Sequence, residues 1–486
     1  MSTLRFTAGY VPGISHEELA WHTLEYSQSD SRLEVKVPIL TPSQMLLMTQ
    51  SVKNACNAQI KTMDVSEIVR AIDQAILRLL DVNNEDRKRI DTLLPIATGM
   101  DATMLRHNFS QYLQTFRALQ LHRFIAQDFS NPKMLDEFQP RITGGWTKAV
   151  GAELITHIWA GNVPGLPLWS LISGLLVKSG TIGKVSSAEP ICASIFAKVL
   201  VDIEPRLADC LSIIWWPNED SNTAIHLFQQ SDIVLAYGGN MALAAVQAQV
   251  PVTTRFLPHG HKLSFGMVSA SALSVVRAKH IAAQAALDIV RYEQQGCYSP
   301  QMFYVERGAQ VSPQEFAQTL CGEMAALAHK YPRSSLSIEE ASHVASWRES
   351  HEFAMLQNPA VQVLGDKKDA FVVVYSDMPV SLNPSPLNRC VFVVAVDSLL
   401  DLMPLLKDQR SYLQTAGLAT DPETLLALGD ALAQAGVTRI CAIGEMTSPA
   451  AGWHHDGRFS LADLVNMVDI EASTEATANQ LTDYEL

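Results

Sequence analysis

The chain has 486 residues, of which 48% are hydrophobic and 18% charged, so it can bury a large core and build two or three domains. Its net charge of −14 argues against a protein that binds nucleic acid, although a local basic pocket for a phosphorylated cofactor remains compatible with it. The longest apolar runs, such as residues 166–177, are too short and too interrupted for a membrane span. The first residues also lack the apolar stretch of a signal peptide, so we expect a cytoplasmic globular protein.

Seven cysteines are spread along the chain, without a CxxC pair. An odd, scattered set suits a reducing compartment and indicates no structural zinc. The neighbours His454 and His455 stand beside Asp456, but adjacent histidines rarely converge on one ion and no third ligand is evident nearby in the sequence. We therefore assign no metal site.

In chain order, residues 1–137 are predicted to be mainly helical, with amphipathic stretches at 65–80 and 105–125. We interpret this region as the N-terminal part of a cofactor-binding domain.

Short apolar strands alternate with helices from residue 154 to residue 249. The pattern predicts strands at 154–160, 181–186, 211–216 and 232–237, and helices at 164–176, 189–203, 223–230 and 241–249. Such alternation is typical of a parallel, doubly wound sheet with a dinucleotide site at its carboxyl edge. Residues 159–262 are therefore expected to form a Rossmann-type core.

A second alternating run follows. It predicts strands at 302–306, 371–375, 391–396 and 439–443, and helices at 313–330 and 422–435. Residues 263–450 thus read as a second α/β domain, with Cys297 near its beginning. The remaining segment, 451–486, is expected to end in a loose acidic tail that contains Glu471, Glu475 and Glu485. The fold class is α/β throughout.

Cys297 directly follows Gly296 at the end of a long apolar helix pattern. A glycine there lets the backbone turn sharply and leaves no Cβ in the way of an incoming carbonyl, and the thiolate of a cysteine is a strong nucleophile. Taken alone, a helix cap followed by an ordinary buried cysteine is the more common explanation. Four further segments shift the balance toward a catalytic thiol.

Two of these segments follow predicted strands. Asn162 lies at a strand-to-helix turn, where its amide can hold an oxyanion, although turns rich in Asn, Pro and Gly are common. Lys184 and Ser186 end the next strand, where they can contact ribose or phosphate; a solvated lysine is the alternative.

The other two segments lie further along the chain. Gly238 and Gly239 precede Asn240 at a strand-to-helix junction, so the backbone can approach a pyrophosphate, but the full GxGxxG fingerprint is absent. His259 and His261 lie upstream of the cysteine as candidate acid–base groups, or as polar loop residues.

In this order and spacing the five segments resemble the aldehyde dehydrogenase superfamily, and more closely its acyl-CoA reductase branch, whose best-known members supply the long-chain aldehyde for bacterial luminescence. The likeness covers roughly residues 140–460. Its most distinctive words are Ala160-Gly161-Asn162-Val163-Pro164, Trp216-Pro217, Gly260-His261-Lys262-Leu263-Ser264-Phe265, Gln295-Gly296-Cys297-Tyr298-Ser299-Pro300-Gln301, Ser385-Pro386-Leu387-Asn388-Arg389-Cys390-Val391 and His455-Asp456-Gly457.

The resemblance implies an aldehyde dehydrogenase-like fold and a role for each matching residue. It makes Cys297 the catalytic thiol, Asn162 the oxyanion-hole amide and Lys184 the lysine on the adenosine side of the cofactor. Gly238 and Gly239 match the loop that covers the pyrophosphate. It also implies a small hairpin, residues 138–158, through which subunits pair in a homo-oligomer.

Two departures from the wider superfamily bear on function. Hydrolytic members carry a Glu upstream of the cysteine that activates water, whereas residues 258–262 contain no carboxylate. An enzyme-bound thioester should then survive until it meets a hydride. The superfamily's Glu that holds the nicotinamide ribose is replaced by the stretch 383–387, which leaves that contact unassigned.

The sequence therefore predicts NADPH-dependent reduction of a fatty acyl thioester to the aldehyde, through an acyl-Cys297 intermediate. Ser186 and Lys184 would tolerate the 2′-phosphate of NADPH, with Glu189 as the main objection. His261 or a helix N-terminus would activate the thiol. The acyl donor is acyl-CoA, a carrier protein or an acyl-transferring protein. The apolar helix with Trp169 favours core packing over a lining for the acyl chain.

Two alternatives stay open. The first is an NAD(P)-dependent aldehyde dehydrogenase that oxidises aldehyde to acid, with water activated by His261. The second is a non-catalytic partner of a carrier-protein assembly.

Overall fold

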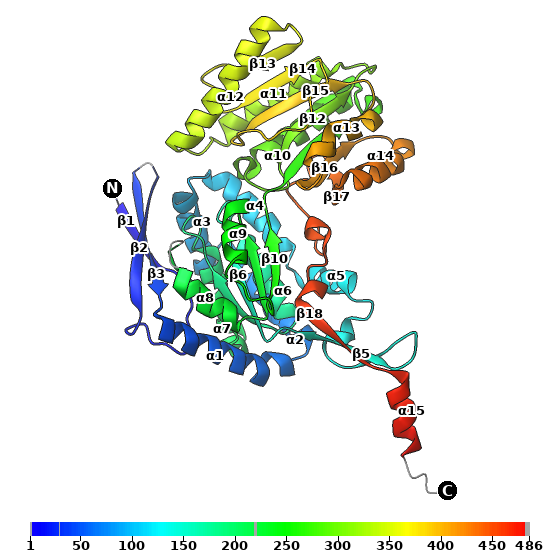
Figure 1. Cartoon of the computed structure of the whole chain (residues 1–486). Coiled ribbons are helices and arrows are strands. Elements are labelled where there is room, and N and C mark those ends of the chain that lie inside the picture. The colour runs from blue at the N-terminus through cyan, green and yellow to red at the C-terminus, as the bar shows by residue number, and fades with distance from the viewer. Residues whose placement is uncertain (1, 29, 218–220, 482–486) are drawn as a thin grey trace.

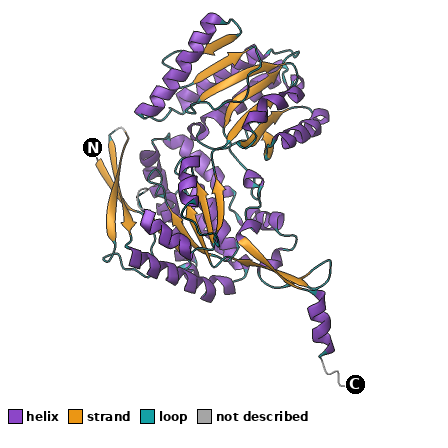
Figure 2. Cartoon of the chain, viewed as in Figure 1, coloured by secondary structure: helices purple, strands orange, loops and turns teal. Residues whose placement is uncertain are grey.

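The computed structural model describes residues 2–28, 30–217 and 221–481, which form two α/β bodies, one above the other in Figure 1, with a narrow arm at the C-terminal end. Each body is a sheet with helices packed against it, as the colouring in Figure 2 makes clear. The two long alternating runs of the sequence become these two sheets.

The lower body contains a five-stranded parallel sheet, as the alternation predicted. Its strands are β6 (Leu154–Ile158), β7 (Gly180–Lys184), β8 (Leu211–Ile214), β9 (Ile233–Tyr237) and β10 (Arg255–His259), in the order β10-β9-β6-β7-β8. The chain runs outward from β6 to β8 and then returns to the other side of β6. The loops after β6 and β9 therefore diverge, which opens a crevice at the carboxyl edge of the sheet.

Helices cover both faces of this sheet. They are α6 (Leu166–Leu176), α7 (Cys192–Ile203), α8 (Ser221–Gln230) and α9 (Asn240–Gln247), close to the predicted ranges. Strand β7 is buried along its whole length, because helices cover it from both sides. Strand β10 was not predicted.

The N-terminal region differs from the mainly helical prediction. It begins with a three-stranded sheet of β1 (Ser2–Thr7), β2 (Ala20–Gln28) and β3 (Ser31–Ile39), followed by α1 (Pro42–Ala58), α2 (Val65–Leu80), α3 (Glu85–Thr98), α4 (Ala102–Gln114) and α5 (Ala118–Asp128). None of the residues of strand β2 is buried, so its apolar pattern is weak. Its partner β3 supplies the buried side chains Leu33, Val35 and Val37.

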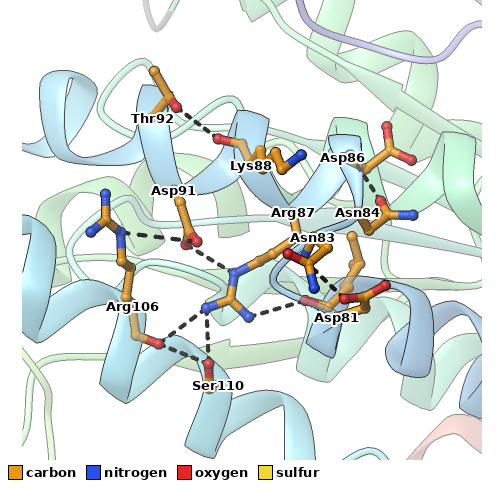
Figure 3. Close-up of polar contacts among 11 residues, drawn as sticks. Asp81, Asn83, Asn84, Asp86, Arg87, Lys88, Asp91, Thr92, Arg106 and Ser110 are labelled. Carbon is orange, nitrogen blue, oxygen red and sulfur yellow. Dashed lines mark hydrogen bonds and ion pairs between the residues drawn. The ribbon is translucent and has the colours of Figure 1, made fainter.

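A buried arginine fastens three of these helices together. Arg87 of α3 is 1% exposed and donates hydrogen bonds to Asp91 Oδ1 at 2.9 Å, to the carbonyl of Leu79 at 3.1 Å, and to Ser110 Oγ at 2.9 Å (Figure 3). It also donates to the carbonyl of Arg106 at 3.3 Å. The guanidinium thereby connects α2, α3 and α4, and it fixes one face of α4.

The upper body contains a seven-stranded sheet in the order β13-β14-β15-β12-β11-β16-β17. The strands are β11 (Leu263–Val268), β12 (Pro300–Glu306), β13 (Val361–Leu364), β14 (Val372–Ser376), β15 (Cys390–Val396), β16 (Leu413–Ala419) and β17 (Arg439–Ala442), and all pairs except β13 with β14 are parallel. Its main helices are α10 (Val275–Val290), α11 (Pro313–Lys330), α12 (Ile338–Gln357) and α14 (Pro422–Ala435). The predictions for α11 and α14 are confirmed to the residue, whereas β11, β13 and β16 were not predicted.

The hairpin prediction needs correction. Within residues 138–158, only β4 (Gln139–Pro140) and β5 (Trp146–Gly151) belong to the arm, because β6 lies at the centre of the five-stranded sheet. The third strand of the arm is β18 (Val465–Ile470), which pairs antiparallel with β5. The C-terminal segment thus returns to build the arm beside β5.

The last described residues are also more regular than predicted. Helix α15 (Ala472–Gln480) extends from the arm and has no buried residue, in place of the loose tail expected there. Glu485 lies outside the described residues. Across the described residues, no helix combines the length and apolar character that crossing a membrane requires.

Candidate active site

A cavity of about 390 Å³ lies where the two bodies meet. The lower body contributes the loops after β6 and β9 together with one face of α4 and the start of α6. The upper body contributes Arg291, Tyr292, residues 294–298 and the loop that follows β17. Cys297, Asn162, Gly238, Gly239 and His261 all line this cavity, so the structure brings five of the predicted site residues together.

Cys297 lies between a short helical turn, Arg291–Gln294, and strand β12. Tyr292, Glu293 and Gln294 have φ angles of 52°, 53° and 64°, so this turn is left-handed. The sharp bend expected at Gly296 is therefore made by residues 292–294, which end two residues before it. The glycine serves another purpose, since a Cβ at Gly296 would lie 2.4 Å from the ring of Tyr298.

Asn162 is attached to the nucleophile loop. Its side-chain amide, Nδ2, donates a hydrogen bond to the carbonyl oxygen of Gln295 at 2.7 Å, two residues before the cysteine. A primary amide has two N–H donors, so one of them remains for an oxyanion in the cavity. The structure therefore places the predicted oxyanion amide beside the predicted nucleophile.

Gly238 and Gly239 follow β9 at the crevice, and Gly239 is the N-cap of α9. A Cβ at Gly239 would meet no atom within 4 Å, so the backbone here is open to a ligand. Asn240 is the first residue of α9 and is exposed, outside the cavity lining.

Lys184 and Ser186 lie one strand further along the edge, at the end of β7, and are not part of the cavity lining. Lys184 is 8% exposed, its Nζ lies 5.5 Å from the Trp216 ring centroid, and burial lowers its pKa to about 8. Ser186 Oγ accepts a hydrogen bond from the N–H of Ala188 at 3.2 Å. Both residues therefore border the neighbouring part of the crevice.

Glu189, the main objection to NADPH, is turned into the protein. It is 2% exposed, and its Oε1 accepts hydrogen bonds from the N–H groups of Ile191 and Cys192, at 2.8 Å each. Burial raises the pKa of this carboxyl, with those hydrogen bonds opposing the rise. The carboxylate caps the start of α7.

The N-terminal sheet reaches the same edge of the crevice. Tyr26 of β2 donates a hydrogen bond from its hydroxyl to the carbonyl of Ser187, and the indole of Trp215 donates to Ser187 Oγ at 3.0 Å. His22 of β2 stacks on Trp215 with ring centroids 4.9 Å apart. Strand β2 therefore helps to hold the loop after β7.

Sequence reasoning missed a buried polar network behind the cysteine. Nδ1 of His259 lies 2.9 Å from Oδ2 of Asp456, and Nε2 of Gln414 donates to Oδ1 of Asp456 at 2.7 Å. The Gln414 side chain also lowers the pKa of Cys297. Three separate segments of the chain supply these side chains. Only the His455-Asp456-Gly457 motif of the family resemblance indicated that one of them, Asp456, could belong to the site.

This network sets the protonation of the site. Burial, and then the charge of Asp456, raise the pKa of Cys297 to about 11, against the opposing effect of the Gln414 side chain. Burial alone would raise the pKa of Asp456, but the hydrogen bond from His259 and the nearby His455 hold it well below its usual range. Burial and the neighbouring His259 lower the pKa of His455 to about 3.

The same residues form a cluster that resembles a metal site. The ligating atoms of His259, His455 and Asp456 lie within 4.8 Å of one another, so a third ligand does exist, contrary to the sequence argument. The two imidazoles are stacked, however, with centroids 4.4 Å apart and planes 17° apart. Lone pairs lie in the ring planes, so nearly parallel rings do not aim at one ion. The hydrogen bond from His259 to Asp456 explains the cluster.

Carboxylates are missing from the cavity itself. Among the residues that the structure describes, none of those that line the cavity is an Asp or a Glu. Gly260, in the stretch where the resemblance led us to expect the Glu of hydrolytic members, lines the cavity, and a Cβ there would come within 3.3 Å of Leu243 and 3.4 Å of Asn240. The departure seen in the sequence is thus a property of the whole cavity.

At the end formed by α4 and α6, the cavity has polar side chains from α4 and apolar ones from α6. Asn108, Gln111 and Tyr112 present the face of α4 opposite to the one held by Arg87, and Leu166 and Trp169 come from α6. Trp169 is 7% exposed and packs against Phe116 and Phe124. It contributes to the core and to the cavity wall at once.

Comparison with known proteins agrees with this site. A family model described as acyl-CoA reductase (LuxC) matches residues 60–467. The long-chain acyl-protein thioester reductases of Photorhabdus laumondii and Aliivibrio fischeri are both 28% identical to the chain, over 364 and 359 residues, which covers 74% and 72% of this chain and 72% and 70% of theirs.

Aldehyde dehydrogenase 21 from Physcomitrella patens has the same fold, with a TM-score of 0.72 at 12% identity over 97% of this chain and 99% of that chain. The fold is therefore aldehyde dehydrogenase-like, as expected. Since the family match runs through both α/β bodies and includes Cys297, the crevice and the polar network, the chain belongs to the acyl-CoA reductase (LuxC) family.

Proposed function

We propose that this protein reduces a fatty acyl thioester to the aldehyde through an acyl-Cys297 intermediate, with a nicotinamide dinucleotide as the reductant. The observation that supports it best is a cysteine in a cavity whose described lining has no carboxylate, at the edge of a parallel sheet. A thioester formed there has no acidic side chain to activate water. The relatives named long-chain acyl-protein thioester reductase agree with this direction.

The crevice fits a dinucleotide. The open backbone at Gly238 and Gly239, with Asn240 at the start of α9, would hold the pyrophosphate. Lys184 and Ser186 would hold the adenosine side, and the inward turn of Glu189 leaves room for the 2′-phosphate of NADPH. When bound, the cofactor supplies hydride to the carbonyl carbon of the acyl group.

Side chains of the protein perform the other steps of the proposed reaction, which are acyl transfer to Cys297 and release of the aldehyde. Cys297 attacks the carbonyl carbon of the donor thioester, and the second N–H of the Asn162 amide stabilises the oxyanion. The donor thiol departs and the acyl group stays on Cys297. After reduction, the hemithioacetal collapses to aldehyde and frees Cys297. His261 lines the cavity as an exposed polar group at its edge.

The proposal also includes the source of the acyl group and the association of subunits. The acyl group arrives from CoA, from a carrier protein or from an acyl-transferring protein, and the arm of β4, β5 and β18 pairs subunits in a homo-oligomer. Seven free cysteines suit a cytoplasmic setting.

Single-turnover chemistry tests the proposed function. The full-length protein is mixed with palmitoyl-CoA, and the acyl adduct on Cys297 is identified by mass spectrometry before NADPH or NADH is added. We expect aldehyde from the parent, and neither adduct nor aldehyde from a folded Cys297→Ser variant, whose hydroxyl is a poor nucleophile. Release of free acid in place of aldehyde would favour the hydrolytic alternative. An unacylated parent would favour the non-catalytic one.

A further inference from the structure

A hydrogen-bonded pair of side chains holds a histidine on the wall of the cavity that Cys297 also lines. Gln414 on β16 donates to Oδ1 of Asp456 at 2.7 Å. The other carboxylate oxygen, Oδ2, lies 2.9 Å from Nδ1 of His259. Gln414, Asp456 and His259 therefore form one line of contacts, and His259 lines the same cavity as Cys297.

The ring of His259 has a fixed orientation. It stacks on Tyr237 with centroids 4.7 Å apart, and on His455 with centroids 4.4 Å apart. Because Asp456 accepts from Nδ1, the neutral imidazole keeps its proton on that nitrogen and presents Nε2 as an acceptor on the opposite side of the ring. An acceptor held in this way is suited to take a proton inside the cavity.

We propose that His259 accepts the proton of Cys297 and passes it to the departing thiol, with Asp456 and Gln414 as positioning residues. This inference rests on the proposed acyl transfer. The Sγ–H bond of Cys297 breaks, an N–H bond forms at Nε2 of His259, and the sulfur electron pair forms the new C–S bond. When the tetrahedral intermediate collapses, the C–S bond to the donor breaks and the donor sulfur takes the proton from His259. Acylation therefore consumes no proton.

The charge of Asp456 has two opposite effects in this scheme. While His259 is neutral, the carboxylate and burial keep Cys297 in its unreactive thiol form, with a pKa of about 11. Once the proton moves to His259, the imidazolium lies against Asp456 and neutralises the charge that opposed the thiolate. The thiol is thus ionised only when His259 has taken its proton.

The other titratable groups around the pair do not duplicate this effect. They are Tyr237, Tyr298, His455, His261, Lys262, Arg291 and Arg439. Burial raises the pKa of both tyrosines and lowers that of His455 to about 3, so all three are neutral at pH 7. Arg439 lowers the pKa of Cys297, and the other basic side chains Lys262 and Arg291 line the same cavity. Asp456 is the carboxylate in contact with His259.

The decisive variant is Asp456→Asn, with two rates measured at pH 7. One is alkylation of Cys297 by iodoacetamide, followed on its tryptic peptide, and the other is release of CoA from palmitoyl-CoA before any reductant is added. We expect alkylation to become about tenfold faster, because removal of the repelling charge lowers the pKa of Cys297 and raises its thiolate fraction. Acylation should become at least about tenfold slower, because His259 loses its orientation. A merely structural role would slow both rates.

A second variant keeps the test decisive if Asp456→Asn folds poorly. His259→Asn retains the charge of Asp456, so we expect slow alkylation together with acylation reduced by about 10²-fold or more at pH 7. The deficit should shrink as the pH approaches 10, where hydroxide can ionise the thiol, and added imidazole should restore part of the rate. Asp463→Asn removes a carboxylate of the same C-terminal segment that pairs with Arg458, and should keep both parental rates.

Several outcomes would overturn the proposal. In Asp456→Asn, alkylation and acylation could slow in parallel. In His259→Asn, acylation could keep the parental rate between pH 6 and 10. The pH-dependent loss of acylation could also appear in His261→Asn in place of His259→Asn. Aldehyde formation by the parent tests the proposed function separately. A parent that makes aldehyde, with variants whose two rates do not diverge, would refute the proton transfer alone.

Discussion

Arg389 and Glu293 form a buried, two-pronged ion pair that joins two left-handed turns behind the nucleophile. The guanidinium nitrogens Nε and Nη2 lie 2.6 and 2.8 Å from the two carboxylate oxygens, and the side chains are 0% and 2% exposed. Leu387, Asn388 and Arg389 have φ angles of 58°, 54° and 68°, which mirrors the turn at 292–294. The N–H of Asn388 also donates to the carbonyl of Glu293 at 3.1 Å.

Left-handed conformations cost non-glycine residues about 1 kcal/mol or more each, so these turns persist only because the surrounding contacts hold them. Arg389→Lys keeps the charge but loses the fork that grips both oxygens. We expect acylation of Cys297 to fall by about 10²-fold, as a displacement of the reacting atom by an ångström can cause. Arg348→Lys, at an arginine paired with Glu352 at 2.8 Å on α12, is the matched control. Equal rates in the two variants would contradict this role for Arg389.

Asn162→Ala removes the proposed oxyanion donor and the bond to Gln295. We expect the chemical step to slow by about 10² to 10³, with cofactor affinity retained. The rate of Cys297 alkylation separates the two functions of the amide. An unchanged alkylation rate would assign the loss to oxyanion stabilisation, whereas a change confined to the Michaelis constant would make Asn162 a binding residue only.

Gly260→Glu restores a carboxylate to the cavity wall. The new Cβ needs a shift of a few tenths of an ångström from Leu243 and Asn240, so the variant should fold. We expect a larger ratio of free acid to aldehyde from palmitoyl-CoA at saturating NADPH, because the carboxylate can activate water against the thioester. Gly260→Gln has the same shape without the base and should keep the parental ratio. If the two variants gave the same ratio, exclusion of water or the speed of hydride transfer would be the protection.

Arg87→Met tests the connection among α2, α3 and α4. It leaves the partly buried Asp91 and two backbone carbonyls without their donor, and we expect a loss of about 3 kcal/mol in the free energy of unfolding. Arg89→Met is the control on the same helix, because Arg89 is 64% exposed and pairs with Asp86 only at 3.8 Å. Its expected effect is within about 0.5 kcal/mol. The midpoints of thermal unfolding of the two variants are compared. Similar midpoints would refute the stabilising role of Arg87 among α2, α3 and α4.

Local signals explain which elements could be predicted. Helix α11 begins with Ser312 as N-cap, Pro313 at its first position and Glu315 completing a capping box, and α14 begins after Asp421 and ends at the left-handed Gly436. A few adjacent residues determine such helix ends, so the sequence alone predicts them. Strand β16, with the sequence LQTAGLA, lacks the β-branched pattern of a strand and owes its place to its neighbours β11 and β17.

The site divides in the same way. Asn162 and the two glycines follow strand ends, so chain order alone placed them at one edge. Cys297 precedes β12 and was predicted from Gly296 and the family resemblance. The pair of His259 and Asp456 depends on a contact between distant segments, and the left-handed turn at 292–294 contains no glycine or asparagine that would announce it. Tertiary packing determines both, and the sequence lacks a local signal for either.

The N-terminal sheet lies outside the region that the family model matches, which begins at residue 60. Yet β2 holds the loop after β7 through Tyr26 and stacks His22 on Trp215. A fragment that begins at residue 60 would keep every residue to which we assign a chemical role. It would lose strand β2, which holds the loop after β7. If the dinucleotide binds along this edge as proposed, its affinity depends on an N-terminal strand that the family model does not match.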